Sequence, residues 1–331
     1  MFLQEFPRVK LAALPTALDH APRLSEALGV RLYLKRDDNT GLALGGNKAR
    51  KLEYLAAQAL ANGCDTLITT GGPQSNHCRM TAAAAAKLGL ECHLVFTSDE
   101  ISVTQGNLLL DILLGAKLHY IGTGEKTASP DEFMAGLAAT LHRQGKRPYI
   151  IPLGGSNSVG ALGYIRGVME LVGQAEATGI SVDYIVHASG SAGTQAGLLA
   201  GAKYFNLPTK VLGISVSRAA SRLSGEVLAL CNETLAKVGS AKAVKADDVR
   251  VYDEYVGGGY GIPTELSLEA TTMFARLEGV IVDPVYTAKG AAGMIDLIRR
   301  GAIEPDSTVL FWHTGGAPAH FADLETHWGA K

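Results

Sequence analysis

Short apolar runs alternate along this chain with longer segments in which apolar residues recur every three or four positions. The short runs predict β-strands at 31–35, 64–70, 91–96, 117–121, 148–152, 184–188, 211–216 and 309–313. The longer segments predict helices at 48–63, 81–88, 107–114, 131–144 and 195–205. Because alternation of strand and helix is typical of parallel sheets, the pattern predicts an α/β protein.

Composition narrows the class of protein. The chain has 331 residues and is 47% hydrophobic, enough for more than one core, so we expect two lobes with a crossing near the glycine-rich stretch 154–163. Its net charge of −2 provides no basic field for nucleic acid, and no stretch has the length of a membrane span. The four cysteines lack zinc-site spacing, so we expect no metal. We expect a cytoplasmic protein that binds a small molecule.

The stretch Gly-Gly-Asn-Lys at 45–48 places one lysine at the start of a predicted helix. Asn47 is a candidate N-cap whose side chain accepts hydrogen bonds from the first-turn amides. The positive end of the helix, together with Arg50 and Lys51, is expected to lower the pKa of Lys48. An amine that has lost its proton can form a Schiff base. A solvated lysine in a basic cluster is the alternative.

Two further glycine turns follow predicted strands and open helices. Ser75, Asn76 and His77 come after the first, and Ser75 and Asn76 are placed to bind an anion, although helix capping by Ser75 or Asn76 explains one of these polar residues. The second turn, Ser-Gly-Ser-Ala-Gly-Thr at 189–194, predicts a phosphate cradle of backbone amides and hydroxyls. Its glycine spacing does not match a dinucleotide fingerprint, and no P-loop is present. A tight turn that permits close helix packing is the alternative.

Three more loops carry candidate side chains. Arg218 follows a strand, and its guanidinium either binds an anionic substrate or is solvated. Tyr260 lies in a glycine-rich loop and is a candidate for contact with the substrate. The segments Asp-Pro-Val-Tyr-Thr at 283–287 and His-Thr-Gly-Gly at 313–316 place polar groups beside sheet ends.

Together these motifs resemble the pyridoxal-phosphate enzymes of the tryptophan-synthase-β type, in the branch of D-cysteine desulfhydrase and 1-aminocyclopropane-1-carboxylate deaminase. The matching motifs spread over nearly the whole chain: Lys-Arg-Asp-Asp from 35, Gly-Gly-Asn-Lys-x-Arg-Lys-Leu-Glu from 45, Gln-Ser-Asn-His from 74, Gly-Ser-Ala-Gly-Thr from 190, Asp-Pro-Val-Tyr from 283 and His-Thr-Gly-Gly from 313. The resemblance implies two open twisted, mostly parallel sheets flanked by helices, with pyridoxal 5'-phosphate between a larger domain (1–50 plus 163–331) and a smaller one (51–162). It also implies a homodimer.

The resemblance further implies roles for single residues. Lys48 would carry the cofactor and act as the base at Cα, Asn76 would bond the ring's 3-oxygen, and Tyr286 would stack on the pyridine. The cofactor would also contact a set of residues from three loops: Ser189, Gly190, Ser191, Ala192, Gly193, Thr194, Thr287, Thr314 and Gly315. The substrate would contact Ser75, Asn76, His77, Tyr260 and Arg218, with Ser75, Tyr260 and Tyr286 as further catalytic groups.

Position 287 separates the branches of this family. The deaminases place a glutamate after the stacking tyrosine, facing the pyridine nitrogen, whereas this chain has Thr287. A hydroxyl makes the ring a milder electron sink, which favours β-elimination over opening a cyclopropane. D-cysteine, giving pyruvate, ammonia and sulfide, is therefore the expected substrate, ahead of L-cysteate, for which Arg218 would serve the sulfonate. A non-catalytic amino-acid or phosphate-binding protein on the same scaffold is the alternative from a different class.

Overall fold

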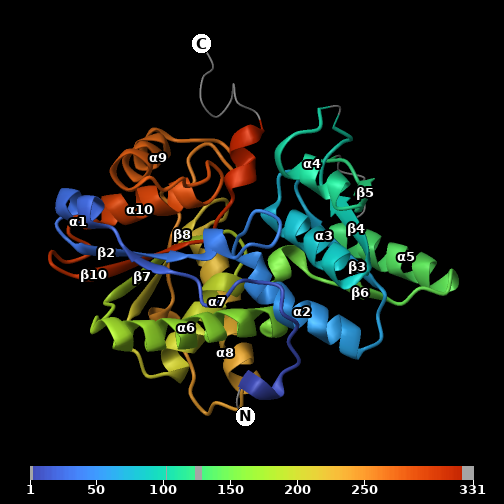
Figure 1. Ribbon diagram of the computed structural model, residues 1–331, viewed down its shortest axis with the longest axis horizontal. Helices are drawn as coiled ribbons and strands as arrows, with labels where there is room; N and C mark the ends of the chain where they lie inside the picture. Colours follow the sequence, from blue (N-terminus) through green and yellow to red (C-terminus); the bar gives the residue numbers. More distant parts are fainter. Residues whose placement is uncertain (1–2, 102, 124–128, 323–331) are drawn as a thin grey trace.

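The computed structural model describes residues 3–101, 103–123 and 129–322. It contains two sheets (Figure 1). The large sheet has the order β1 (Leu18–His20), β2 (Arg31–Arg36), β10 (Thr308–His313), β7 (Tyr184–Ser189), β8 (Lys210–Ser215) and β9 (Arg250–Tyr252). The small sheet has the order β5 (Lys117–Tyr120), β4 (Glu91–Phe96), β3 (Thr66–Gly71) and β6 (Pro148–Ile150). All pairings are parallel except that of β1 with β2.

Ten α-helices lie in the described part of the chain: α1 (Pro22–Leu28), α2 (Lys48–Ala61), α3 (Asn76–Leu88), α4 (Gly106–Leu113), α5 (Pro130–Arg143), α6 (Ser158–Thr178), α7 (Gly193–Tyr204), α8 (Ala220–Lys237), α9 (Glu265–Glu278) and α10 (Thr287–Arg299). Five short 3-10 turns accompany them: η1 (Leu3–Glu5), η2 (Asp37–Asn39), η3 (Leu153–Gly155), η4 (Ala246–Asp248) and η5 (Ala317–Phe321). None of these α-helices is both long and apolar enough to cross a bilayer.

The large sheet is covered on both faces, because alternate residues of its strands point to opposite sides. Leu310 and Trp312 of β10 pack with α6, α7 and α8, whereas Val309 and Phe311 pack with α1, α9 and α10. Figure 1 shows these two helix layers above and below the sheet. The core of the small sheet likewise divides between α3 on one face and α5 on the other.

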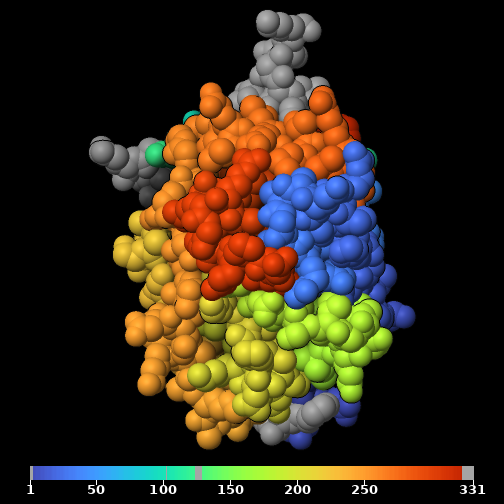
Figure 2. Space-filling view, turned by 90° about the vertical axis from the view of Figure 1, so that its left-hand side faces the viewer, coloured from blue at the N-terminus to red at the C-terminus, as the bar shows by residue number. Residues whose placement is uncertain are grey.

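Segments from the two ends of the chain are joined in the large sheet. Residues 31–36 of β2 pair in parallel with residues 308–313 of β10. In the space-filling view the blue N-terminal and red C-terminal segments therefore lie side by side (Figure 2). Pairing over this sequence separation means that a site at the sheet edge draws on both halves of the chain.

The predicted fold class, two mostly parallel sheets flanked by helices, is confirmed. All strands of the small sheet fall within residues 51–162, and those of the large sheet fall outside them. The domain boundaries themselves stay a prediction. The sequence pattern did not indicate β1, β9 or the helices α1, α6, α8, α9 and α10, and it placed the start of α3 five residues too late.

Candidate active site

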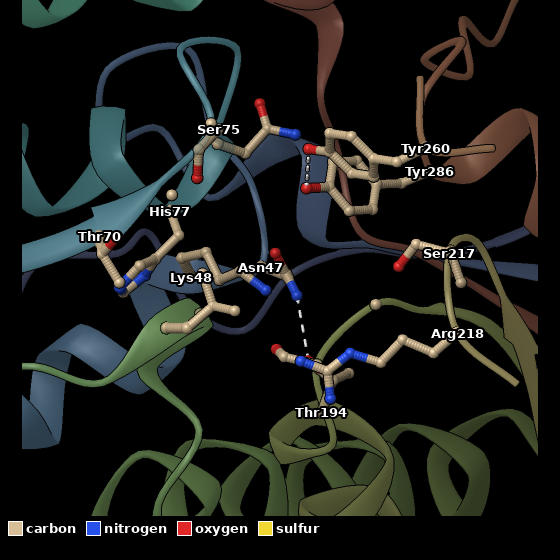
Figure 3. Close-up of a pocket in the computed structure, with 18 of the residues that line it drawn as sticks. Asn47, Lys48, Thr70, Ser75, His77, Thr194, Ser217, Arg218, Tyr260 and Tyr286 are labelled. Carbon is tan, nitrogen blue, oxygen red and sulfur yellow. Dashed lines mark hydrogen bonds between the residues drawn. The ribbon is translucent and has the colours of Figure 1, made fainter. Parts of the chain in front are cut away.

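A cavity of about 440 Å³ opens between the two sheets (Figure 3). Its walls come from the carboxyl ends of parallel strands, where loops and helix starts converge. Thr70 and Gly71 end β3 in the small sheet, while Gly190 and Thr314 follow β7 and β10 in the large sheet. The cavity thus lies between the carboxyl ends of the strands of the two sheets.

Lys48 is the first residue of α2, and its partly buried side chain lines this cavity. Burial lowers the pKa of its ammonium from 10.5 to about 8. We expected the charges of Arg50 and Lys51 to contribute. Both expectations were wrong, because burial alone accounts for the shift. The Arg50 guanidinium is buried against Asp37 at 2.7 Å and Glu170 at 3.0 Å, so its charge is balanced.

The predicted N-cap role of Asn47 was also wrong. Asn47 has helical backbone angles, and its side chain caps no first-turn amide. Instead, its Nδ2 donates to Thr194 Oγ1 at 3.2 Å, and its backbone N–H donates to the Thr314 carbonyl at 2.9 Å (Figure 3). Asn47 therefore ties the turn that carries Lys48 to two loops of the large sheet.

The glycine turn at 190–194 joins β7 to α7, as predicted for a phosphate cradle. Gly190, Ser191 and Thr194 line the cavity, whereas Ser189, Ala192 and Gly193 are not among its lining residues. A Cβ atom on Gly193 would lie 2.8 Å from Lys51 Nζ and 2.7 Å from Ser156 Oγ. It would also lie 2.9 Å from the backbone Cα of Ser156, so a larger residue at position 193 would push the turn away from Ser156.

Lys51 supplies a buried amine beside this turn. Its Nζ donates to the Gly154 carbonyl at 3.0 Å and lies 3.5 Å from Ser156 Oγ, and it has no carboxylate partner among the described residues. Burial and the neighbouring Lys48 lower its pKa well below the usual value. A phosphate bound at this turn would give the Lys51 ammonium the anionic partner that it does not have among the described residues. The residues present therefore fit a phosphorylated cofactor.

Residues 75–77 begin α3 on the opposite wall, and all three line the cavity. Ser75 Oγ accepts from the Cys78 N–H at 3.3 Å, so the capping alternative holds for Ser75. The Thr69 hydroxyl donates its one proton to the Ile151 carbonyl at 2.9 Å, and it must therefore accept from His77 Nε2 at 2.8 Å.

This contact sets the tautomer of His77. With the proton on Nε2, Nδ1 is an acceptor, and it is buried without a partner among the described residues. Burial and the nearby Lys48 and Lys51 hold the pKa of His77 well below its usual value, so the ring is neutral. His77 Nδ1 can therefore accept a hydrogen bond, but the ring does not supply a positive charge.

Tyr260 and Tyr286 form a pair at the far side of the cavity. Their hydroxyl oxygens are 2.5 Å apart and their rings meet edge to face, with centroids at 5.7 Å (Figure 3). Burial raises the pKa of Tyr260 to about 12 and raises that of Tyr286 as well. Both hydroxyls are consequently neutral, and since one donates to the other, the pair has one proton left for a ligand. A Cβ atom on Gly190 would lie 3.3 Å from the Tyr286 ring, so the cradle and this ring are neighbours.

Thr287 is placed differently from what we expected. It is fully buried and is not among the lining residues. Its hydroxyl donates to Asp283 Oδ1 at 2.7 Å and accepts from the Asp283 N–H at 2.6 Å. The proton that we assigned to the cofactor's ring nitrogen is therefore already used.

Of the remaining predicted residues, some line the cavity and one does not. Thr314 lines the cavity, while Gly315 does not. Gly315 instead lies against the Lys48 turn, where an added Cβ atom would be 2.8 Å from Gly46 Cα. Arg218 lines the cavity, but its guanidinium forms an ion pair with Glu226, which reduces the positive charge available to a ligand.

Sequence reasoning missed the roles of two residues that shape the site. Lys51 was assigned only an electrostatic role, and Arg79 was assigned none. Arg79 Nη2 donates to the Gly45 carbonyl at 3.0 Å and lies 3.4 Å from Asn76 Oδ1, so it links the Lys48 turn to α3. The single available signal was its position within the Gln-Ser-Asn-His-Cys-Arg motif.

Comparison with known proteins agrees with this arrangement. The sequence model of the family described as "Pyridoxal-phosphate dependent enzyme" matches residues 9–315. The D-cysteine desulfhydrases of Salmonella typhi and Salmonella schwarzengrund are each 44% identical over 325 residues, which covers 97% of this chain and 97% of theirs.

Solved structures show the same relation. The crystal structure of an ACC deaminase homologue has a TM-score of 0.91 at 37% identity, covering 99% of this chain and 97% of that one. The threonine deaminase of T.th. shares the fold, with a TM-score of 0.64 at 23% identity over 91% of this chain and 92% of that one. The resemblance drawn from the motifs is confirmed, and the chain belongs to the pyridoxal-phosphate dependent enzyme family.

Proposed function

We propose that this enzyme catalyses α,β-elimination on a small β-substituted amino acid, with D-cysteine as the preferred substrate. D-cysteine and water would give pyruvate, ammonia and hydrogen sulfide. The observation that carries the proposal is the match along nearly the whole chain to D-cysteine desulfhydrases at 44% identity. The cavity supports it, because Lys48 has a lowered pKa and lines the same cavity as Gly190, Ser191 and Thr194 of the proposed phosphate cradle.

The residues that would hold pyridoxal 5'-phosphate come from both sheets. Lys48 would bind the aldehyde, the 190–194 turn and Lys51 would hold the phosphate, and Asn76 and Tyr286 would contact the ring. Bound in this way, the cofactor withdraws electrons from Cα of an attached amino acid and so makes the Cα proton acidic.

Lys48 would act as the base for that proton, because its pKa near 8 leaves part of it neutral at physiological pH. As the Cα–H bond breaks, the Cβ–S bond breaks too and sulfide leaves with the bonding electrons. The hydrogen bond between the Tyr260 and Tyr286 hydroxyls uses one of their two protons, and the departing sulfur would take a proton from the hydroxyl whose proton is free.

Of the three residues 75–77, Ser75 and Asn76 would bind the substrate carboxylate, and His77 would lie beside it. The first two offer a hydroxyl and an amide at the start of α3, where backbone amides favour an anion. Neutral His77 would accept a hydrogen bond rather than pair with the carboxylate.

Two alternative reactions, elimination from L-cysteate and deamination of 1-aminocyclopropane-1-carboxylate, can each be judged from one residue. Arg218 lies in the cavity and would suit the sulfonate of L-cysteate, but its ion pair with Glu226 weakens that attraction. Deamination of 1-aminocyclopropane-1-carboxylate is disfavoured because position 287 carries no carboxylate to keep the ring nitrogen protonated.

The test is a product analysis with four substrates. The purified protein is incubated with D-cysteine, L-cysteine, L-cysteate and 1-aminocyclopropane-1-carboxylate, and sulfide, sulfite, pyruvate and 2-oxobutyrate are quantified. We expect sulfide and pyruvate in equal amounts from D-cysteine, and none with the Lys48→Ala variant. Turnover of the cyclopropane substrate alone would refute the proposal, and a colourless protein that takes up no cofactor would favour a simple binding protein.

We also propose that the enzyme works in the cytoplasm as a homodimer. All four cysteines lie in the described part of the chain and are unpaired, which is typical of a reducing compartment. The dimer rests on the family resemblance and on the prevalence of two-fold assemblies. Sedimentation equilibrium of the holoenzyme at micromolar concentration would decide its oligomeric state.

A further inference from the structure

Asn76 is the first residue of α3 and is one of the residues that line the cavity. Such an amide has an accepting oxygen at one end and a donating nitrogen at the other. Which end faces the cavity decides whether Asn76 can bind an acceptor or a donor there. The answer comes from groups around it whose chemistry is unambiguous.

The first such group is the backbone carbonyl of Gln74. It can only accept a hydrogen bond, and the side chain of Asn107 lies 2.8 Å from it, so the contacting atom is Asn107 Nδ2. Asn107 is the second residue of α4, is fully buried and is not among the residues that line the cavity. Its own backbone N–H donates to Gln74 Oε1 at 2.9 Å, which holds the two segments together.

The orientation of Asn76 follows from this assignment. Asn107 Nδ2 also lies 3.1 Å from an atom of the Asn76 amide, which must then be the acceptor Oδ1. Arg79 Nη2 is 3.4 Å from the same atom, and a guanidinium can only donate. Two donors from behind therefore occupy the oxygen, and Nδ2 is the end left for the cavity.

Asn107 is an unfavourable choice if packing alone matters. Its Oδ1 is buried without a hydrogen-bond partner among the described residues, a situation that an apolar side chain would avoid. The preceding Gly106 allows no side chain either, because a Cβ atom there would be 2.4 Å from Gln74 Oε1. The start of α4 is thus fitted closely against the loop that leads into Asn76.

We propose that Asn107 is a positioning residue that fixes the Asn76 amide with its N–H donors toward the cofactor. This inference rests on the proposed function, in which the ring oxygen of pyridoxal phosphate is the acceptor for Asn76. Asn107 lies in α4, thirty-one residues after Asn76 in the chain, and it would act only through Asn76.

The test compares Asn107→Ala with Asn107→Asp. Alanine removes the donors, whereas the isosteric aspartate replaces them with lone pairs that face the Gln74 carbonyl and Asn76 Oδ1. We expect pyridoxal phosphate to bind about tenfold more weakly to the alanine variant, a factor equal to about 1.4 kcal/mol, and more weakly still to the aspartate variant. The visible absorbance band of each holoenzyme should shift in the same direction as that of Asn76→Ala.

Three controls separate this role from a structural one. Asn232→Asp makes the same change in a partly buried asparagine of α8, which bonds Val244, and should leave affinity and spectrum unchanged. The Asn76→Ala/Asn107→Ala double variant should bind no more weakly than Asn76→Ala alone. Thermal unfolding of each variant is recorded, and if Asn107→Asp does not fold, the alanine cycle decides alone.

Several results would overturn the inference while leaving the proposed function intact. They are wild-type affinity and spectrum in both Asn107 variants, a smaller effect of the isosteric aspartate than of alanine, or an equal further loss when Asn107→Ala is added to Asn76→Ala. If the wild-type protein itself shows no visible band with pyridoxal phosphate, the proposed function fails, and the inference fails with it.

Discussion

The rate at which the cofactor-free enzyme captures pyridoxal phosphate should depend on pH through Lys48. Only the neutral amine attacks an aldehyde, and burial lowers the pKa of this amine from 10.5 to about 8. At pH 7 the neutral fraction is therefore about one in ten, against about one in three thousand for an ordinary lysine, a gain of about 300-fold.

The assay is a stopped-flow measurement of the visible band after mixing with pyridoxal phosphate, between pH 7 and pH 11. We expect the capture rate to rise with pH and to level off above a midpoint near 8. Because burial and not a neighbouring charge causes the shift, Lys51→Met should move this midpoint by less than about half a unit, even if it weakens phosphate binding.

Two results would refute this reasoning. A rate that continues to rise through pH 10 would mean that the amine titrates like a solvated lysine. A midpoint that moves up by a unit or more in Lys51→Met would mean that charge repulsion, not burial, lowers the pKa of Lys48.

The remaining predictions concern stability and protonation. Lys48→Met removes a buried charge, so it should raise the free energy of unfolding of the cofactor-free protein by up to about 3 kcal/mol at pH 7, measured by urea titration. This gain should decrease as the pH rises from 8 to 10.5, because the folded wild-type protein loses the Lys48 charge near pH 8. Asp37→Ala should cost about 3–5 kcal/mol, since it leaves the buried Arg50 guanidinium with too little negative charge, while Glu269→Ala at an exposed pair should cost under about 1 kcal/mol. The ¹⁵N shifts of His77 should report a neutral ring with the proton on Nε2 from pH 5 to 9, and a protonated ring at pH 6 would contradict the assigned tautomer.

The loops that carry candidate chemistry were predictable because their signals are local. A strand followed by glycines and then by small polar residues indicates a turn that opens a helix, wherever that strand lies in a sheet. This is why Lys48, Asn76 and the 190–194 turn were identified from the sequence and are found around one cavity.

Glycines had the opposite effect on α6, which was not predicted. Gly163 and Gly167 lower helix propensity, and in a sequence they indicate a loop. In the structure a Cβ atom on Gly163 would lie 2.2 Å from the Arg50 carbonyl, so the residue is there to let α2 approach α6. The contact that explains the glycine lies 113 residues away and leaves no periodic pattern in the sequence.

The sequence by itself determined the alternation of strands and helices, the turns at their ends and the family to which those turns belong, because each depends on residues close together in the chain. Only the tertiary structure decided which groups are desolvated and which donors meet which acceptors. In the tertiary structure Asn47 bonds Thr194 instead of capping a helix, and the Thr287 hydroxyl donates to Asp283. The side chain of Asn107 donates to that of Asn76. The pKa of a side chain and the direction of its hydrogen bonds depend on neighbours that folding brings from distant segments.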